Sequence, residues 1–253
     1  MRYDHHIFDV GAFNGLDGIA LALQNQKVMI HAFEANPSMI KTIKSNKKKI
    51  EDFLGKKIRN FKVNNYAVSD KNAFLKLNIA LNPTVSSLHK FSKEINKTWP
   101  GYSELHFKYI KQVKVKGITL KKYCEKNDIK KINYLHIDTQ GNDLKVLKGL
   151  KDYINIVEKG VLEAAVNKKK ALYQNSNTIN QIKKFLKSNK YIITKIDSLD
   201  ENIKNEKNIF FEKKNYVEKY DIKTNYNLRY YNRIVSGKIN LKDVILNFLK
   251  KLI

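Results

Sequence analysis

The chain has 253 residues, a single cysteine, and 49 basic against 24 acidic side chains, for a formal net charge of +25. This length fits one α/β domain with a sizeable core, and the sequence holds no apolar run of the roughly 18 residues that a membrane helix needs. Cys124 has no partner for an internal disulfide, and a core strand begins too early to leave room for a signal peptide. We therefore expect a cytoplasmic protein.

Lysine supplies most of the positive charge. The arginines are Arg2, Arg59, Arg229 and Arg233. Proteins that bind nucleic acids favour arginine over lysine, because the planar guanidinium can donate two hydrogen bonds to one base or phosphate. Because lysine, asparagine and isoleucine are all abundant, the charge is typical of an A+T-rich coding sequence, and a nucleic-acid partner is not favoured.

The first elements are a strand, a glycine-rich turn and a helix. An apolar run over 7–10 leads into Gly11-Ala12-Phe13-Asn14-Gly15, and a helical apolar pattern continues to Leu23. A second strand, 28–33, ends in Glu34, whose carboxylate is placed to accept hydrogen bonds from both hydroxyls of a ribose. This order predicts a nucleotide cradle, in which the glycines let the backbone approach a ligand.

The glycine spacing indicates which nucleotide is bound. Gly11, Gly15 and Gly18 do not match the dinucleotide pattern G-x-G-x-x-G, and no Gly-Lys-Ser/Thr phosphate loop is present. Asp9, at the end of the first strand, would repel a pyrophosphate but suits the amino group and sulfonium of S-adenosylmethionine. The sequence thus favours a methyltransferase over a dehydrogenase. The candidate cofactor-binding residues in these segments are Asp9, Gly11, Ala12, Asn14, Gly15, Glu34 and Ala35.

Further along, Asn36-Pro37-Ser38 opens a helix, 61–68 reads as a third strand before the turn at Ser69-Asp70, and 74–79 alternates as an added strand. Residues 80–110 have no clean period, so we interpret them as a substrate lid, with a plain surface insertion as the alternative. His89 and His106 lie there without cysteine or carboxylate partners at ligand spacing, so no metal site is expected.

The second half alternates strands and helices. A short strand is predicted at 113–115, a helix capped by Thr119, strands at 134–138 and 159–166, helices from Gly141-Asn142-Asp143 and over 178–188, and strands at 191–196 and 208–211. This alternation predicts a mostly parallel sheet with helices on both faces.

Four segments carry a family resemblance: DVGAFNG at 9–15, FEANP at 33–37, NNYAVSD at 64–70 and LHIDTQGNDLKVLKG at 135–149. Over about residues 5 to 212 the chain resembles the FkbM-type S-adenosylmethionine-dependent methyltransferases. The resemblance implies a class I, Rossmann-like, doubly wound fold whose seven-stranded sheet is mostly parallel with an antiparallel edge strand. It also implies O-methylation of a sugar or other small hydroxylated acceptor, with surface-glycan modification as the expected setting, and it places Asp70 near the adenine.

The chain departs from the family pattern at three positions. His136 stands where lysine is common, Gln140 where glutamate is common, and Phe13 in the place of an asparagine.

Methyl transfer to a hydroxyl needs an aligned acceptor and the removal of a proton. Asp138 ends the fourth strand, where ligands of open α/β sheets bind, and is a candidate general base or cofactor orienter. His136 lies two residues earlier and so shares its sheet face; the alternative is a buried, hydrogen-bonded strand residue. Glu163, in the fifth strand, is a third catalytic candidate. Asp143 lies in a first helical turn and is interpreted as structural.

Two rival functions stay open: an RNA methyltransferase, suggested by the net charge, and a non-catalytic binding module with a methyltransferase-like fold. We place the methyltransferase domain at 1–212 and an extension at 213–253. In the extension, apolar residues from Leu241 to Ile253 fall on one helical stripe. We expect this helix to pack on its own domain or in a homodimer, ahead of lying on an anionic membrane surface.

Overall fold

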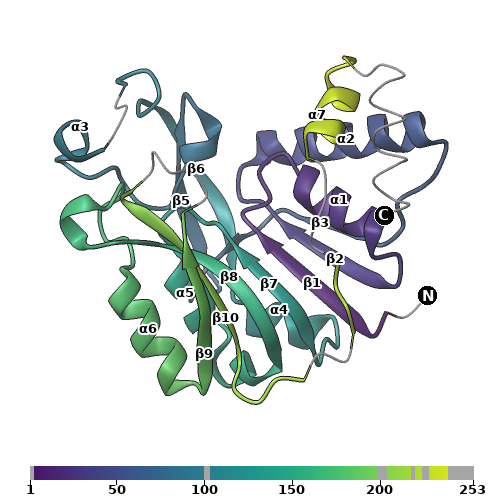
Figure 1. Cartoon of the computed structure of the whole chain (residues 1–253). Helices are drawn as coiled ribbons and strands as arrows, with labels where there is room; N and C mark the ends of the chain where they lie inside the picture. Colours follow the sequence, from purple (N-terminus) through teal and green to yellow (C-terminus); the bar gives the residue numbers. More distant parts are fainter. Residues whose placement is uncertain (1–2, 100–102, 199–203, 218–219, 224–227, 239–253) are drawn as a thin grey trace.

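A computed structural model describes the chain except for residues 1–2, 100–102, 199–203, 218–219, 224–227 and 239–253. Its centre is a seven-stranded sheet in the order β3-β2-β1-β7-β8-β10-β9 (Figure 1). The strands are β1 (His5–Val10), β2 (Val28–Phe33), β3 (Phe61–Asn64), β7 (Ile132–Ile137), β8 (Val157–Ala165), β9 (Tyr191–Asp197) and β10 (Glu206–Lys213). β10 runs antiparallel to β8 and β9, while the other pairs are parallel. The predicted doubly wound class I fold is confirmed, with β10 inserted beside the edge strand β9.

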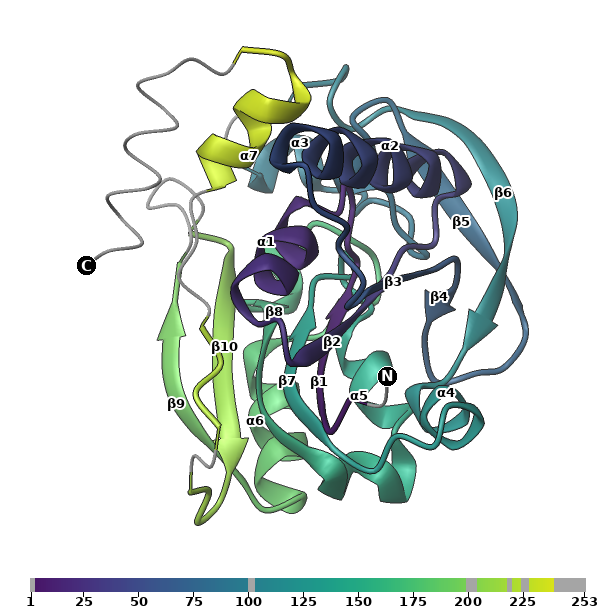
Figure 2. The ribbon, with the colours of Figure 1, turned by 90° about the vertical axis from the view of Figure 1, so that its right-hand side faces the viewer.

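Helices cover both faces of this sheet, because successive strand residues point to opposite sides. α1 (Leu16–Gln24), α2 (Pro37–Leu54) and α7 (Leu228–Val235) lie together on one face (Figures 1 and 2). They pack on side chains such as Ile7 and Ile30. α4 (Leu120–Lys126), α5 (Asp143–Lys148) and α6 (Ile179–Ser188) cover the other face, against Phe8, Leu135 and Leu162. A 3₁₀ turn, η2 (Lys151–Ile156), leads from α5 into β8.

A second sheet of three strands stands beside the first, in the order β4-β6-β5. Its strands are β4 (Ala67–Val68), β5 (Phe74–Ala80) and β6 (Tyr109–Ile118). The strand predicted at 61–68 is therefore wrong as one element: β3 stays in the main sheet, while β4 pairs with β6. The strand predicted at 113–115 is also too short, because exposed lysines along β6 hide its alternation.

The described residues of the segment at 80–110 fold against the residues that follow β8. It contains η1 (Pro83–Val85) and α3 (Ile95–Thr98), and η3 (Lys168–Lys170) lies nearby. Phe91 is buried between the rings of Tyr109 and Tyr173, with centroid distances of 4.3 and 5.4 Å. The described residues of this segment, which we call the cap, therefore share a small apolar core with Leu172 and Tyr173.

The described part of the C-terminal extension packs on the domain. Tyr230, Tyr231 and Ile234 of α7 are buried against α1 and α2. The helix predicted from Leu241, with its proposed dimer or membrane contact, lies outside the described residues, and the domain boundary stays a prediction. In the part of the chain that the structure describes, no helix has the length and apolarity to cross a membrane.

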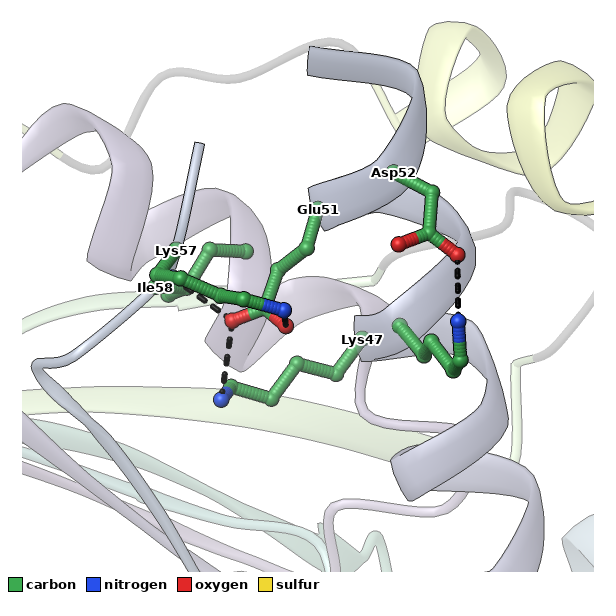
Figure 3. Close-up of polar contacts among 6 residues, drawn as sticks. Lys47, Glu51, Asp52, Lys57 and Ile58 are labelled. Carbon is green, nitrogen blue, oxygen red and sulfur yellow. Dashed lines mark hydrogen bonds and ion pairs between the residues drawn. The ribbon is translucent and has the colours of Figure 1, made fainter. Parts of the chain in front are cut away.

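The end of α2 contrasts a buried carboxylate with an exposed one (Figure 3). Glu51 is 8% exposed and accepts hydrogen bonds from the backbone N–H of Ile58, at 2.7 Å, and from Lys47 and Lys57. One residue on, Asp52 pairs with Lys48 at 2.7 Å in solvent. Glu51 therefore fixes the turn that leads into β3.

Glu51→Ala should lower the free energy of unfolding by about 1–3 kcal/mol, because the buried N–H of Ile58 loses its acceptor. The matched variant Asp52→Ala removes a carboxylate from the same helix end but breaks only an exposed pair, so it should leave stability almost unchanged. Urea denaturation of both variants measures the difference, and equal losses would contradict this role for Glu51.

Candidate active site

A cavity of about 450 Å³ opens at the carboxyl ends of β1, β2, β7 and β8. The strand ends supply its floor, and the cap supplies further lining through Pro83–Leu88, Trp99 and Phe107. Open α/β sheets bind their ligands at this position, beyond the carboxyl ends of the strands. The interpretation of 80–110 as a substrate lid remains a prediction, since the structure shows one position of the cap.

Asp9 and His136 meet on the cavity floor. The parallel register of β1 and β7 sets the two residues side by side, and His136 Nδ1 lies 2.9 Å from Asp9 Oδ1. Asp9 is 1% exposed. Burial opposes protonation of His136, but the hydrogen bond and charge of Asp9 prevail and raise the pKa of His136 to about 9. The histidine is therefore protonated at neutral pH and compensates the buried carboxylate.

Glu34 ties the glycine-rich turn to the start of α2. Its Oε2 accepts from the N–H of Phe13 at 2.9 Å, and its Oε1 accepts from the N–H of Asn36 at 2.7 Å. Burial raises the pKa of Glu34 to about 7, against the lowering effect of these N–H groups. A carboxylate has about four lone-pair sites, so Glu34 keeps acceptor capacity for a ligand.

Packing within the protein requires glycine at two positions of the turn. Gly11 has φ +96°, and a Cβ there would lie 1.7 Å from the carbonyl oxygen of Asp138. Gly15, at φ +76°, caps α1, and a Cβ there would meet the side chain of Ile43. The glycines thus let the ends of β1 and β7 and the helices α1 and α2 come together, and their service in ligand approach stays a prediction. Phe13, at φ +47°, occupies a left-handed position that asparagine tolerates better.

Asp138 is linked to the cap by hydrogen bonds. Its Oδ1 accepts from Gln140 Nε2 at 2.7 Å, and Gln140 Oε1 accepts from the hydroxyl of Tyr173 at 2.7 Å. The Tyr173 hydroxyl also lies 2.9 Å from the Val85 carbonyl, and Ser87 Oγ donates to the Gln140 carbonyl. Burial raises the pKa of Asp138, while His136 and Gln140 act in the opposite direction. Sequence reasoning named neither Gln140 nor Tyr173 as a site residue.

A second cluster of acidic side chains lies where β8 and β10 pair. Glu163 and Glu206 both line the cavity, whereas Asp143 lies behind it and accepts from Thr139 at 3.2 Å. Burial, followed by the charge of Asp138, raises the pKa of Glu206 to about 8, that of Asp143 to about 7, and that of Glu163 well above its ordinary value. Glu206 was missed because the last strand was predicted to begin at Asn208.

The cavity brings together most of the residues predicted from the sequence. The predicted residues that line it are Asp9, Gly11, Ala12, Glu34, Ala35, His136, Asp138 and Glu163. Asn14, Gly15 and Asp70 lie outside the lining: Asn14 Oδ1 accepts from the N–H of Leu16, and Asp70 accepts from Ser69. Among the described residues no group of histidine, cysteine and carboxylate side chains could hold a metal ion.

Comparison with known proteins gives one family. Residues 9–193 match the model of the Methyltransferase FkbM domain, and no curated protein matches the chain. Similar solved structures include the FkbM methyltransferase of Methylobacillus flagellatus, with 11% identity, a TM-score of 0.48 and coverage of 83% of this chain and 44% of that one.

Two further structures are similar at this level. M. capricolum TrmK in complex with S-adenosylhomocysteine has 13% identity and a TM-score of 0.43, with 87% of this chain and 68% of that one covered. The fibrillarin/Nop5p complex has 13% identity and a TM-score of 0.43, with 84% and 74% covered. Of the FkbM methyltransferase from Methylobacillus flagellatus, this chain spans less than half of the length.

The pairing of Asp9 with His136 predicts a pH dependence. The pKa of His136 in the fold, about 9, exceeds the ordinary 6.5. Its stabilising contribution is therefore complete below pH 6.5 and is lost as the pH rises through about 9. NMR titration should show the His136 ring titrating near 9 in the wild type and near or below 6.5 in Asp9→Asn. A His136 pKa that Asp9→Asn leaves in place would contradict the pairing.

Proposed function

The chain belongs to the FkbM methyltransferase family, and from this premise we propose that it transfers a methyl group from S-adenosylmethionine to a hydroxyl of a sugar or another small hydroxylated acceptor. Surface-glycan modification is the setting that we favour. The observation that carries the proposal is the row of Asp9, His136 and Asp138 across the cavity floor, beside the carboxylate of Glu34.

The cavity residues fit this cofactor. When bound, it supplies a methyl group activated by a positively charged sulfur. Asp9 Oδ2 is buried and, within the described residues, has no hydrogen-bond partner, so it is available to a cationic amino group. Glu34 has acceptor capacity left for the two ribose hydroxyls. We assign these two carboxylates to the cofactor, together with the backbone of Gly11, Ala12 and Ala35.

Asp138 is our candidate for the general base. Its position at the end of β7 places it on the cavity wall, and its raised pKa brings it closer to the proton affinity that a base needs near neutral pH. Gln140 donates a hydrogen bond that fixes one oxygen of Asp138 and leaves the other for the acceptor hydroxyl. His136, held by Asp9, supports the negative charge of Asp138.

The rival functions receive less support from the cavity. An RNA acceptor would bring phosphates toward a cavity lining rich in carboxylates, which would repel them. The positive net charge of the chain therefore does not favour RNA at this cavity. A non-catalytic module would be favoured by an occluded cofactor turn, whereas Gly11, Ala12 and Phe13 line an open cavity.

Cofactor binding should stabilise the protein. A ligand that binds the folded state alone adds about 2.7 kcal/mol at a hundredfold excess over its dissociation constant, so S-adenosylmethionine should raise the melting temperature. Glu34→Gln should weaken binding about tenfold or more, and the exposed Asp52→Asn should not change it. Calorimetric titration gives the dissociation constants, and the absence of any signal at millimolar cofactor would refute the assignment.

Asp138→Asn should reduce methyl transfer by about 10²-fold or more, because the acceptor loses its base, while the dissociation constant of the cofactor changes by less than about tenfold. Radiolabelled transfer to a panel of glycans, small alcohols and RNAs measures the rate. His136→Lys should retain activity if this position only supplies a positive charge. An Asp138→Asn protein with the wild-type rate would leave Asp138 as a turn residue.

A further inference from the structure

We propose that the acceptor carries a protonated amine beside its reacting hydroxyl, and that Glu163 and Glu206 bind this ammonium group. The inference rests on the proposed function, because it names the class of acceptor for the same cavity. An amino sugar is the simplest molecule of this class.

The strand pairing sets the two glutamates on one face. In the antiparallel register of β8 and β10, Glu163 is opposite Asn208 and Glu206 is opposite Ala165, so both side chains project from the same side of the sheet and both line the cavity. Three strand spacings, roughly 14 Å, separate β8 from β2, and Glu34 directly follows β2. The glutamates therefore occupy the far end of the cavity from the proposed ribose site.

Within the described residues, neither glutamate side chain has a cationic partner or a hydrogen-bond donor. In the described part of the chain, no hydrogen bond or ion pair reaches either side-chain carboxyl group. The charges that act on them are those of other carboxylates, Asp138 and Asp143 among them, and these repel. Two uncompensated, largely buried carboxyl groups are costly to hold in an empty cavity. A cation that enters from solvent would remove this cost.

Acidic side chains outnumber cationic ones over the described lining of the whole cavity. Its acidic lining residues are Asp9, Asp17, Glu34, Asp138, Glu163 and Glu206. The cationic lining residues, within the described chain, are His136, which is held by Asp9, and Lys207, whose Nζ donates to Ser198. Asp9 is 1% exposed, and its Oδ2 has no partner among the described residues, but this oxygen is the one that we assign to the amino group of the cofactor. A chain of net charge +25 thus has a cavity lined by more carboxyl groups than cationic side chains.

An ammonium group matches this end of the cavity chemically. It offers three N–H donors and a positive charge to two carboxylates that can only accept once ionised. A neutral sugar would supply donors without the charge, and a uronate or a sugar phosphate would be repelled. The amine has to lie toward β10, because Asp138 on β7 is the proposed base for the hydroxyl.

The reaction leaves the ammonium unchanged. The acceptor oxygen forms its bond to the methyl carbon as the carbon–sulfur bond breaks, the bonding electron pair stays on sulfur as a thioether, and the hydroxyl proton passes to Asp138. A protonated amine has no free electron pair and so does not compete as the nucleophile.

Calorimetric titration of glucosamine, glucose and glucuronate into the full chain, with S-adenosylhomocysteine present, tests the inference. Glucosamine should bind at least about tenfold more tightly than glucose, and glucuronate should give no signal. In the double variant Glu163→Gln, Glu206→Gln the preference for glucosamine over glucose should disappear. Glu212→Gln, farther along β10 and outside the cavity lining, is the control and should keep the preference.

The outcomes separate this inference from the proposed function. Replacing two carboxyl groups that lack partners among the described residues should leave the melting temperature unchanged or higher. Glu206→Gln alone, with a partial loss of preference, serves if the double variant fails to fold. Equal binding of glucosamine and glucose, no binding of glucosamine, or a preference that survives in the double variant would overturn the amine site. Failure of the proposed function would appear instead as no binding of the cofactor in the absence of any sugar.

Discussion

The site depends on the charge of one buried carboxylate. Asp9 is 1% exposed on β1, the strand between β2 and β7, where an uncompensated carboxylate would be strongly unfavourable. The parallel register brings His136 to it at 2.9 Å, and the imidazolium supplies the missing charge. This pair fixes the end of β7, since Asp138 follows two residues later and donates its N–H to the carbonyl of Val10 at 2.8 Å. The cofactor turn and the candidate base are thereby held together.

A second link joins this floor to the cap. The amide of Gln140 donates to Asp138 on one side and accepts from Tyr173 on the other, while Tyr173 also reaches the carbonyl of Val85. A glutamate at this position, common in the family, would set two carboxylates against each other unless one held a proton. Gln140 removes that requirement, because its amide donates to Asp138 and accepts from Tyr173 at the same time.

Local patterns predicted most of the main sheet, and contacts between distant segments account for what they missed. β2 was predicted with the bounds that it has, because its apolar run and its terminal Glu34 are local signals. The break between β3 and β4 carries no glycine or proline, and the second sheet is made by pairing with β6, about fifty residues away. At the site, Asp9, Glu34 and Asp138 stand at strand ends and could be predicted. Glu206 reaches the cavity only through the antiparallel placement of β10, and Tyr173 reaches Gln140 only through its packing against the cap.

The central claim is that the carboxylates at the strand ends hold the cofactor. A crystal structure of the protein with S-adenosylhomocysteine tests it most directly. The account predicts both ribose hydroxyls within hydrogen-bonding distance of Glu34, and the amino group beside Oδ2 of Asp9, with the Glu163 end of the cavity left open for an acceptor. A ligand bound elsewhere on the protein, or lying in the cavity with its ribose at Glu163 and Glu206, would contradict the account.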